Sequence, residues 1–383
     1  MSFQIDSRLP DVGTTIFTVI SQLAQEHNAI NLGQGFPDYS GPALLHERLE
    51  HYAQGQQHQY PPMTGIPALR QCVAEKIDRF YQYTADPEQE ITIVPGATEG
   101  LFCAIQACVK PGDEVIVFDP AYDSYVPAIT LAGARSVHIP LYAPDFQIDW
   151  QRVKEAITAK TSMIIINTPH NPTGMVMSEQ DMQSLQRLVR DTKIVVLSDE
   201  VYEHLVFDGQ LHQSVLRFPE LAERAIMVSS FGKTFHVTGW KTGYCVAPAQ
   251  LSEELRKVHQ FVTFVGVTPI QLALADFMQA CPEHAEQLPA FYQAKRDLFA
   301  AAMADSKFTF TPAAGSFFQL MDYSEISDKD DLGMARWLTT EAGVAAIPIS
   351  LFYDAPPESR LVRFCFAKED ETLIKAASIL SAL

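Results

Sequence analysis

The chain has 383 residues, of which 47% are hydrophobic and 19% charged, a composition typical of a folded globular protein with more than one domain. Its formal net charge of −18 argues against nucleic acid or an anionic membrane as the main partner. No apolar segment reaches the ~18 residues that span a membrane, and no secretory signal is visible, so we expect a cytoplasmic protein. The six cysteines show no paired spacing, which favours buried thiols over disulfides and predicts no metal site.

The first 45 residues are rich in turns, and we expect them to join a small domain or to lie across a cleft. Gly33 and Gly35 are similar to the start of a dinucleotide-binding fingerprint, but the third glycine position is Asp38. The spacing therefore argues against a nucleotide site in this segment.

Between residues 66 and 247, short β-rich runs alternate with helical patterns. The expected strands are residues 91–94, 114–118, 136–139, 163–166, 194–197, 226–228 and 244–246, and the clearest helices are 99–109, 150–159 and 179–190. Near-continuous apolar strands separated by amphipathic helices predict an α/β fold with a mostly parallel sheet covered on both faces. Because ligands bind outside the carboxyl ends of such strands, the residues that follow each strand form the candidate site.

The segment after the first of these strands is a candidate anion site. Gly96, Ala97 and Thr98 stand where a helix is expected to begin, and the N–H groups of a helix start bind anions, here with help from a threonine hydroxyl. An ordinary helix cap by Thr98 explains the same residues. Both interpretations stay open at this point.

Two further loops carry side chains suited to a planar ligand. Tyr122 follows the strand at 114–118 and can stack on a ring, although a core tyrosine is the commoner role. Asn171 lies in a turn made rigid by Pro169 and Pro172, and it offers an amide donor. A structural turn explains the prolines but does not require the asparagine.

Asp199 follows the strand at 194–197. A carboxylate at the end of a buried strand is costly unless it is paired with a cation, and a protonated ring nitrogen would serve. At an effective dielectric constant near 20, opposite charges ~4 Å apart gain ~4 kcal/mol. A salt bridge or a helix N-cap is the structural alternative.

Lys233 stands just past the apolar run at 225–228. A lysine carried into a site at the end of a buried strand can lose hydration, lower its pKa and act as a nucleophilic amine. The run Gly232-Lys233-Thr234 is not a P-loop, because the glycine required five residues before Gly232 is Met227. An isolated lysine is most often a surface residue, so this prediction depends on the other strand ends.

After about residue 270 the pattern changes to long helices at 271–278 and 293–303, short strands at 308–310, 316–321 and 361–366, and a final helix. We therefore predict a large cofactor-binding α/β domain at residues 46–270. A smaller α+β domain would consist of residues 1–45 and 271–383.

Three motifs in this order resemble the class I/II aminotransferases, which are pyridoxal 5'-phosphate enzymes of fold type I. They are Asn-Thr-Pro-His-Asn-Pro-Thr-Gly at 167–174, Ser-Asp-Glu-Val-Tyr at 198–202 and Ser-Phe-Gly-Lys at 230–233. The resemblance extends over residues 32–366 and is strongest to the branch of methionine aminotransferases and kynurenine–glutamine aminotransferases.

The resemblance implies a role for each candidate residue. Lys233 would form a Schiff base with the cofactor and carry a proton, and Asp199 would pair with the pyridinium nitrogen. Tyr202 and Asn171 would donate to the phenolic oxygen, and Tyr122 would stack on the ring. The residues implied to hold the phosphate are Gly96, Ala97, Thr98, Ser230 and Lys241, with Tyr60 supplied by the neighbouring subunit of a homodimer.

The same resemblance implies a substrate site. Arg363 would bind the α-carboxylate, and Gly35, Phe36 and Asn171 would line the pocket. The implied reaction moves an amino group from an amino acid to a 2-oxo acid in a ping-pong cycle, with a methionine, aromatic or glutamine-like donor. A pyridoxal-phosphate-dependent carbon–sulfur β-lyase on the same scaffold is the alternative.

Overall fold

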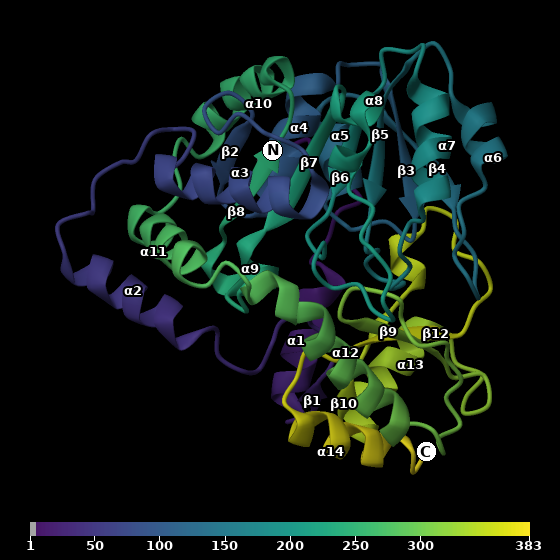
Figure 1. The fold of residues 1–383 in the computed structure, drawn as a ribbon. Helices are drawn as coiled ribbons and strands as arrows, with labels where there is room; N and C mark the ends of the chain where they lie inside the picture. Colours follow the sequence, from purple (N-terminus) through teal and green to yellow (C-terminus); the bar gives the residue numbers. More distant parts are fainter. Residues whose placement is uncertain (1–4) are drawn as a thin grey trace.

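A seven-stranded sheet forms the centre of the computed structural model, which describes residues 5–383 (Figure 1). The strand order is β2-β8-β7-β6-β5-β3-β4, and neighbours are parallel except where β8 pairs antiparallel with β2 and β7. The strands are β2 (Ile91–Val94), β3 (Glu114–Asp119), β4 (Arg135–Pro140), β5 (Thr161–Asn167), β6 (Val195–Asp199), β7 (Ala225–Ser230) and β8 (Gly243–Val246). The predicted α/β fold with a mostly parallel sheet is confirmed.

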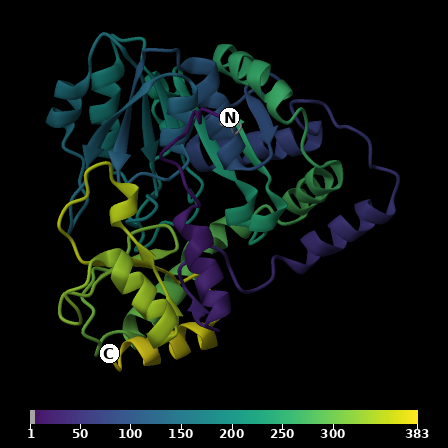
Figure 2. The same cartoon turned by 180° about the vertical axis from the view of Figure 1, so that it is seen from behind.

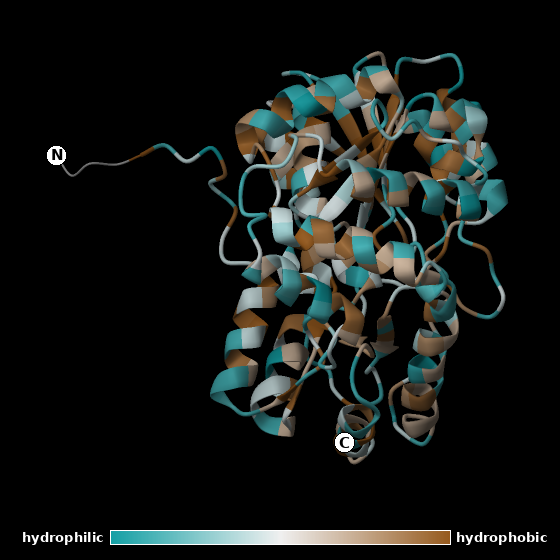
Figure 3. Cartoon of the chain, turned by 60° about the vertical axis from the view of Figure 1, so that its left-hand side comes forward, coloured by the Kyte–Doolittle hydropathy of each residue, from teal (hydrophilic) through white to brown (hydrophobic). Residues whose placement is uncertain are grey.

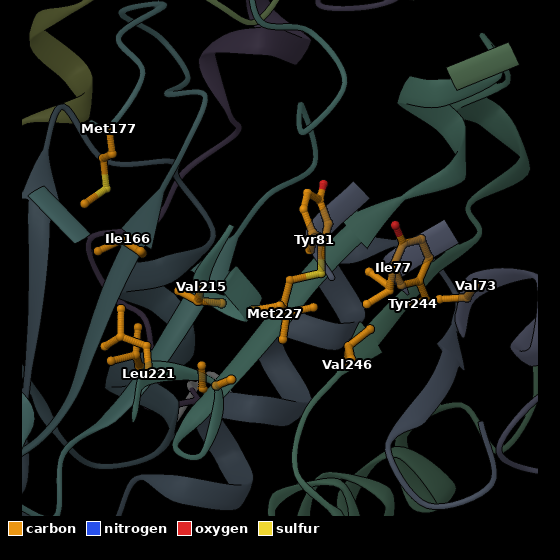
Figure 4. Packing of buried hydrophobic residues seen from close by; sticks show 14 of the residues in the cluster. Val73, Ile77, Tyr81, Ile166, Met177, Val215, Leu221, Met227, Tyr244 and Val246 are labelled. Atoms are coloured by element: carbon orange, nitrogen blue, oxygen red, sulfur yellow. The ribbon is translucent and has the colours of Figure 1, made fainter. Parts of the chain in front are cut away.

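Helices cover both faces of this sheet because successive side chains of a strand point to opposite sides. On β6, for example, Val196 joins one buried cluster and Leu197 the other. Figure 4 shows part of the first cluster, in which Met227 of β7 lies among side chains that include Tyr81 and Val215. The covering helices are α3 (Pro67–Tyr81), α6 (Trp150–Ala156), α7 (Glu179–Val189), α8 (Pro219–Ala222) and α11 (Thr268–Ala280) on that face, and α4 (Ala97–Cys108), α5 (Tyr125–Leu131) and α10 (Ala249–Val262) on the other.

A second, smaller layer contains residues 16–31 and most of the C-terminal part of the chain, as Figure 2 shows for the purple helix and the yellow segments. The antiparallel sheet β11-β12-β9 and the parallel pair β1-β10 lie there. The strands are β1 (Ile30–Asn31), β9 (Phe318–Asp322), β10 (Val344–Ala345), β11 (Ile347–Pro348) and β12 (Leu361–Cys365). The helices are α1 (Ile16–Glu26), α12 (His284–Ala302), α13 (Asp331–Trp337) and α14 (Asp370–Leu380).

Helix α2 (Ala43–Gln54) stands at the side of the large sheet and packs against α11, with Tyr52 Oη donating to Asp276 Oδ2 at 2.8 Å (Figure 1). The surface helices are amphipathic, and Figure 3 shows brown, apolar strands between helices whose outer faces are largely teal. No helix within residues 5–383 is long and apolar enough to cross a membrane.

The sequence predicted each strand of the large sheet within one or two residues of its observed bounds. The strand expected at 308–310 was wrong, because that segment forms only a single bridge from Thr309 to Asp322. Helix α12 begins at His284, earlier than expected, and continues through Pro289. The turn-rich description of the first 45 residues missed α1, which Thr15 caps by accepting from the backbone N–H of Thr18.

Candidate active site

The candidate residues converge because they follow strands that end at one edge of the large sheet. Asp199 is the last residue of β6, and Tyr122 and Lys233 come after β3 and β7, which run in the same direction. Lys241 joins them because β8 runs in the opposite direction, so the start of β8 lies at the edge where its neighbours end. Arg363 of β12 reaches the same place from the smaller layer.

A cavity of about 440 Å³ lies at this edge. Most of the predicted residues line it, namely Gly35, Phe36, Ala97, Thr98, Tyr122, Asn171, Asp199, Tyr202, Ser230, Lys233, Lys241 and Arg363. Gly96 does not line the cavity but lies next to Lys241. Tyr60 is also outside the cavity, with 80% of its surface exposed.

One end of the cavity is suited to an anion. Helix α4 begins at Ala97, and its N-cap residue Gly96 provides no side chain to the first-turn N–H groups. Gly96 has a φ of +84°, and a Cβ there would lie 3.2 Å from Lys241 Nζ. Because Gly96 occupies the N-cap position, Thr98 is not the helix cap. The hydroxyl of Thr98 lies 3.5 Å from the hydroxyl of Tyr122.

Lys233 occupies α9 (Phe231–Thr234), directly after β7. Its Nζ donates to the carbonyl of Gly35 at 3.0 Å and lies 5.0 Å from the ring centre of Phe317 and 5.5 Å from that of Tyr202. Burial lowers the pKa of this amine from 10.5 to about 8. At pH 7, about one amine in ten is therefore neutral, against roughly one in three thousand at the ordinary pKa.

Asp199 is buried, and a tyrosine hydroxyl donates a hydrogen bond to its carboxylate. Tyr125 Oη donates to Asp199 Oδ2 at 2.6 Å, and the backbone N–H of Val201 approaches Oδ1 at 3.4 Å. Burial raises the pKa of the carboxyl from 3.8 to about 6. No regular helix starts at Asp199, so the N-cap alternative is wrong.

Arg363 is 1% exposed and stacks on the ring of Phe318, with 3.8 Å between its Cζ and the ring centre. Nη1 donates to Asn171 Oδ1 and Nη2 to the carbonyl of Gly33, both at 2.7 Å. Its Nε has no hydrogen-bond partner among residues 5–383. Burial lowers the pKa of the guanidinium only to about 10, so Arg363 is charged at pH 7. A buried cation with an unused donor is suited to a carboxylate.

Asn171 and Tyr202 complete the wall beside Lys233. Arg363 fixes the orientation of the Asn171 side chain by bonding to its oxygen, which leaves the amide nitrogen as the available donor. The Tyr202 ring packs edge-on against Phe317 and Phe318, and burial raises the pKa of its hydroxyl well above 10. Tyr202 therefore remains a neutral donor at physiological pH.

Several residues that line the cavity were not predicted from the sequence. Phe17 of α1 reaches the cavity with its ring centre 5.2 Å from Arg363 Cζ, and Phe318 comes from β9. Asn167 links two loops by donating to the Asp199 carbonyl and accepting from the Asn171 N–H. Asn167 could have been found, because it stands in the same motif as Asn171. The positions of Phe17 and Phe318 depend on packing between distant segments.

Comparison with known proteins agrees with this geometry. The family model "Aminotransferase class I and II" matches residues 27–380. Methionine aminotransferase of Escherichia coli (strain K12) is 52% identical over 377 residues, which cover 98% of each chain. Kynurenine–oxoglutarate transaminase 3 of Mus musculus is 35% identical over 412 residues, covering 100% of this chain and 90% of that protein.

Solved structures give the same result. YbdL from Escherichia coli, whose structure and reactivity identify a methionine aminotransferase function, matches with a TM-score of 0.97, 51% identity and full coverage of both chains. None of the names of these relatives supports the β-lyase alternative. Enzymes of this family transfer amino groups between amino acids and 2-oxo acids with pyridoxal 5'-phosphate as cofactor. This chain belongs to the class I and II aminotransferases and is a pyridoxal-phosphate-dependent transaminase.

Proposed function

We propose that this aminotransferase takes methionine or an aromatic or glutamine-like amino acid as donor, and that Arg363 holds the donor's α-carboxylate. The observation that carries this proposal is the unpartnered Nε of Arg363, whose guanidinium lies close to the rings of Phe17 and Phe318. Uncharged side chains fit such apolar walls. The methionine aminotransferase relative at 52% identity supports the same donor class.

The charges of the cavity also disfavour an acidic donor side chain. Its lining contains three cationic side chains, those of Lys233, Lys241 and Arg363. Lys241 faces Gly96 at the anion-binding end, and Lys233 is the proposed attachment point of the cofactor. Only Arg363 is then left for a substrate carboxylate, so a second, distal carboxylate would have no cation of its own.

The residues fit the cofactor at both of its polar ends. Gly96, Ala97 and Thr98 would hold the phosphate with the first-turn N–H groups of α4, because a Cβ at position 96 would fill the space beside Lys241. Ser230 and Lys241 would add a hydroxyl and a charge. At the other end, Asp199 would pair with the ring nitrogen while Tyr122 packs on the ring face.

When bound, the cofactor supplies an electron sink for the charge that develops at the substrate α-carbon. Lys233 would bind the cofactor through its neutral amine, which the dry site makes available. Asn171 and Tyr202 would donate to the phenolic oxygen, and Gly35 and Phe36 would close the cavity over the substrate. The amine of Lys233 would also be placed to move a proton to or from the α-carbon.

A donor–acceptor matrix on purified protein tests this proposal. With 2-oxo acids as acceptors, methionine, phenylalanine, tyrosine and glutamine should be used better than aspartate or glutamate. Product amino acid is quantified by chromatography, and pyruvate and ammonia are measured without acceptor to detect a β-lyase. A clear preference for aspartate or glutamate would contradict the assignment of the pocket.

We propose that two subunits form a homodimer in which Tyr60 reaches the partner's phosphate site. Tyr60 is exposed and packs edge-on against Phe264, with ring centres 5.5 Å apart. Phe261 near the end of α10 is 87% exposed, and Val267, which follows this helix, is 58% exposed. Such a set of exposed apolar side chains is typical of a surface that another chain covers.

Hybrid dimers test whether Tyr60 acts across the interface. Subunits carrying Tyr60→Ala and subunits carrying Lys233→Ala are expected to be impaired alone. When co-expressed with different tags and purified through both, their hybrid should regain about half of the wild-type activity per dimer. One site then combines an intact Lys233 with an intact Tyr60 from its neighbour.

The two tags distinguish this result from simple mixing, because parental dimers are removed. If Tyr60 served its own subunit, the hybrid would hold no complete site and would stay as impaired as Tyr60→Ala alone. A monomer in sedimentation at assay concentration would contradict the homodimer itself.

We propose a cytoplasmic location and a division into two domains at the boundaries given above. All six cysteines are free thiols, which a reducing compartment preserves. Residues 46–270 contain the whole seven-stranded sheet, and the smaller sheets lie outside this range.

A further inference from the structure

The hydrogen bond from Tyr125 to Asp199 has a role that goes beyond burial of a polar pair. Tyr125 is 3% exposed and belongs to the apolar cluster on the α4 side of the sheet, at the start of α5. Its ring is held by this core, so its hydroxyl has a fixed position beside Asp199. That hydroxyl donates to Asp199 Oδ2 at 2.6 Å, while Asp199 itself lines the cavity.

The other groups that face Asp199 cannot replace this contact. Lys233 of α9 acts on the carboxylate as a favourable charge, and Glu200 as an unfavourable one. Glu200 bonds instead to Ser198, His212 and the Val215 N–H. The remaining titratable groups near the carboxylate are the hydroxyls of Tyr122 and Tyr202. Tyr125 is therefore the side chain that donates directly to Asp199.

We infer that Tyr125 is a positioning residue that keeps the Asp199 carboxylate ionised and oriented toward the cofactor's ring nitrogen. This inference rests on the proposed pairing of Asp199 with that nitrogen. Oδ2 is engaged by Tyr125, and Oδ1 has only the long contact with the Val201 N–H. The carboxylate thus has one oxygen anchored in the core and capacity left for a ligand.

The direction of the effect follows from simple electrostatics. Burial raises the pKa of Asp199 to about 6, and the Tyr125 hydrogen bond opposes this rise because it stabilises the charged form. Without the hydroxyl, the pKa of Asp199 should rise further, and the protonation equilibrium should shift about tenfold toward the neutral carboxyl. The carboxyl would then be partly protonated at neutral pH and would lose its charge for the ring nitrogen.

Binding of pyridoxamine 5'-phosphate to the full-length protein between pH 5 and 8 measures this effect. The amine form of the cofactor cannot bond covalently to Lys233, so its affinity reports the non-covalent contacts. Below the pKa of Asp199, affinity should fall tenfold per pH unit. Relative to its own value at pH 8, Tyr125→Phe should therefore lose about tenfold more affinity at pH 5 than the wild type does.

Tyr81→Phe is the matched control. Tyr81 is also a buried tyrosine, and it donates to a buried carboxylate, Glu203, in a network away from the cavity. Its removal should leave the pH profile of binding unchanged, even if it lowers stability. Ionisation of the cofactor's phosphate affects all variants alike and cancels in the comparison.

A graded substitution distinguishes an effect of Tyr125 on the pKa of Asp199 from a purely structural role. Replacing Tyr125 by 3-fluorotyrosine keeps the ring and strengthens the hydrogen-bond donor. The acidic limb of the binding profile, where cofactor affinity falls with pH, should then shift to lower pH than in the wild type. Tyr125→Phe should shift it to higher pH. An identical acidic limb in all three proteins would overturn the inference.

Asp199→Asn distinguishes failure of the inference from failure of the proposed function. Asparagine carries no charge, so this variant should bind the cofactor weakly at every pH. If it bound as tightly as wild type, the pairing of Asp199 with the ring nitrogen would be wrong. If it bound weakly while Tyr125→Phe had a normal profile, only the role of Tyr125 would be wrong.

Discussion

Lys233→Ala should lower the rate of transamination at least about a thousandfold. In the proposed mechanism this one side chain would supply both the bond to the cofactor and a proton-transfer group, and the latter alone contributes about 10²- to 10⁴-fold. Steady-state transfer from methionine to a 2-oxo acid measures the loss. No neighbouring amine can take over, since Lys241 faces Gly96 at the phosphate end. The visible absorbance of the lysine-bound cofactor should disappear together with the activity.

The same substitution should leave the fold intact. Because burial depresses the pKa of Lys233, the cost of burying its charged form opposes folding in full below about pH 8. This cost declines between pH 8 and the ordinary pKa of 10.5, and it is absent above that value. At pH 7 the cofactor-free variant should unfold at the same temperature as the cofactor-free wild type or at a higher one. Lys375→Ala, which removes an exposed lysine of α14, is the control and should change neither activity nor absorbance. Substantial transfer by Lys233→Ala would refute the role of this amine.

Arg363→Ala should lower kcat/KM about 10²- to 10³-fold for every amino acid and 2-oxo acid. Loss of one partner of a buried, charged hydrogen-bonded pair costs about 2–5 kcal/mol, and each 1.4 kcal/mol is a factor of ten. Arg363→Lys should recover little, because a lysine cannot reproduce the planar contacts with Asn171, the Gly33 carbonyl and a carboxylate at once.

A substrate without the carboxylate makes this test specific. 3-(Methylthio)propylamine has the side chain of methionine but no α-carboxylate, so Arg363→Ala should use it no worse than the wild type does. Arg360→Ala is the matched control, because Arg360 is a partly exposed arginine near the start of β12 that pairs with Asp328. Equal losses with methionine and with the amine would show that Arg363 acts on the fold and not on the substrate.

The sequence identified the large sheet and most of the cavity for one physical reason. Parallel strands buried on both faces are near-continuous apolar runs, so their ends are easy to locate, and the polar residues after them share one edge of the sheet. Asp199 and Lys233 were found in this way. The smaller layer was harder to predict, because β1, β10 and β11 have two residues each and show no periodicity.

Contacts between distant segments explain what the sequence missed. Tyr125 stands three residues after Tyr122, yet its bond to Asp199 depends on the position of α5, which packs against α4 and β4. Phe17 reaches Arg363 only because α1 lies against the C-terminal strands. Tyr60 does not line the cavity of its own chain, so its proposed role would depend on a second subunit.

Reduction of the holoenzyme with borohydride, followed by proteolysis and mass spectrometry, tests whether Lys233 bears the cofactor. Reduction makes the bond between the cofactor and the protein permanent, and we expect one reduced cofactor per chain, on the peptide that contains Lys233. A cofactor found on Lys241 or on any other lysine, or a holoenzyme that retains no cofactor after reduction, would contradict it.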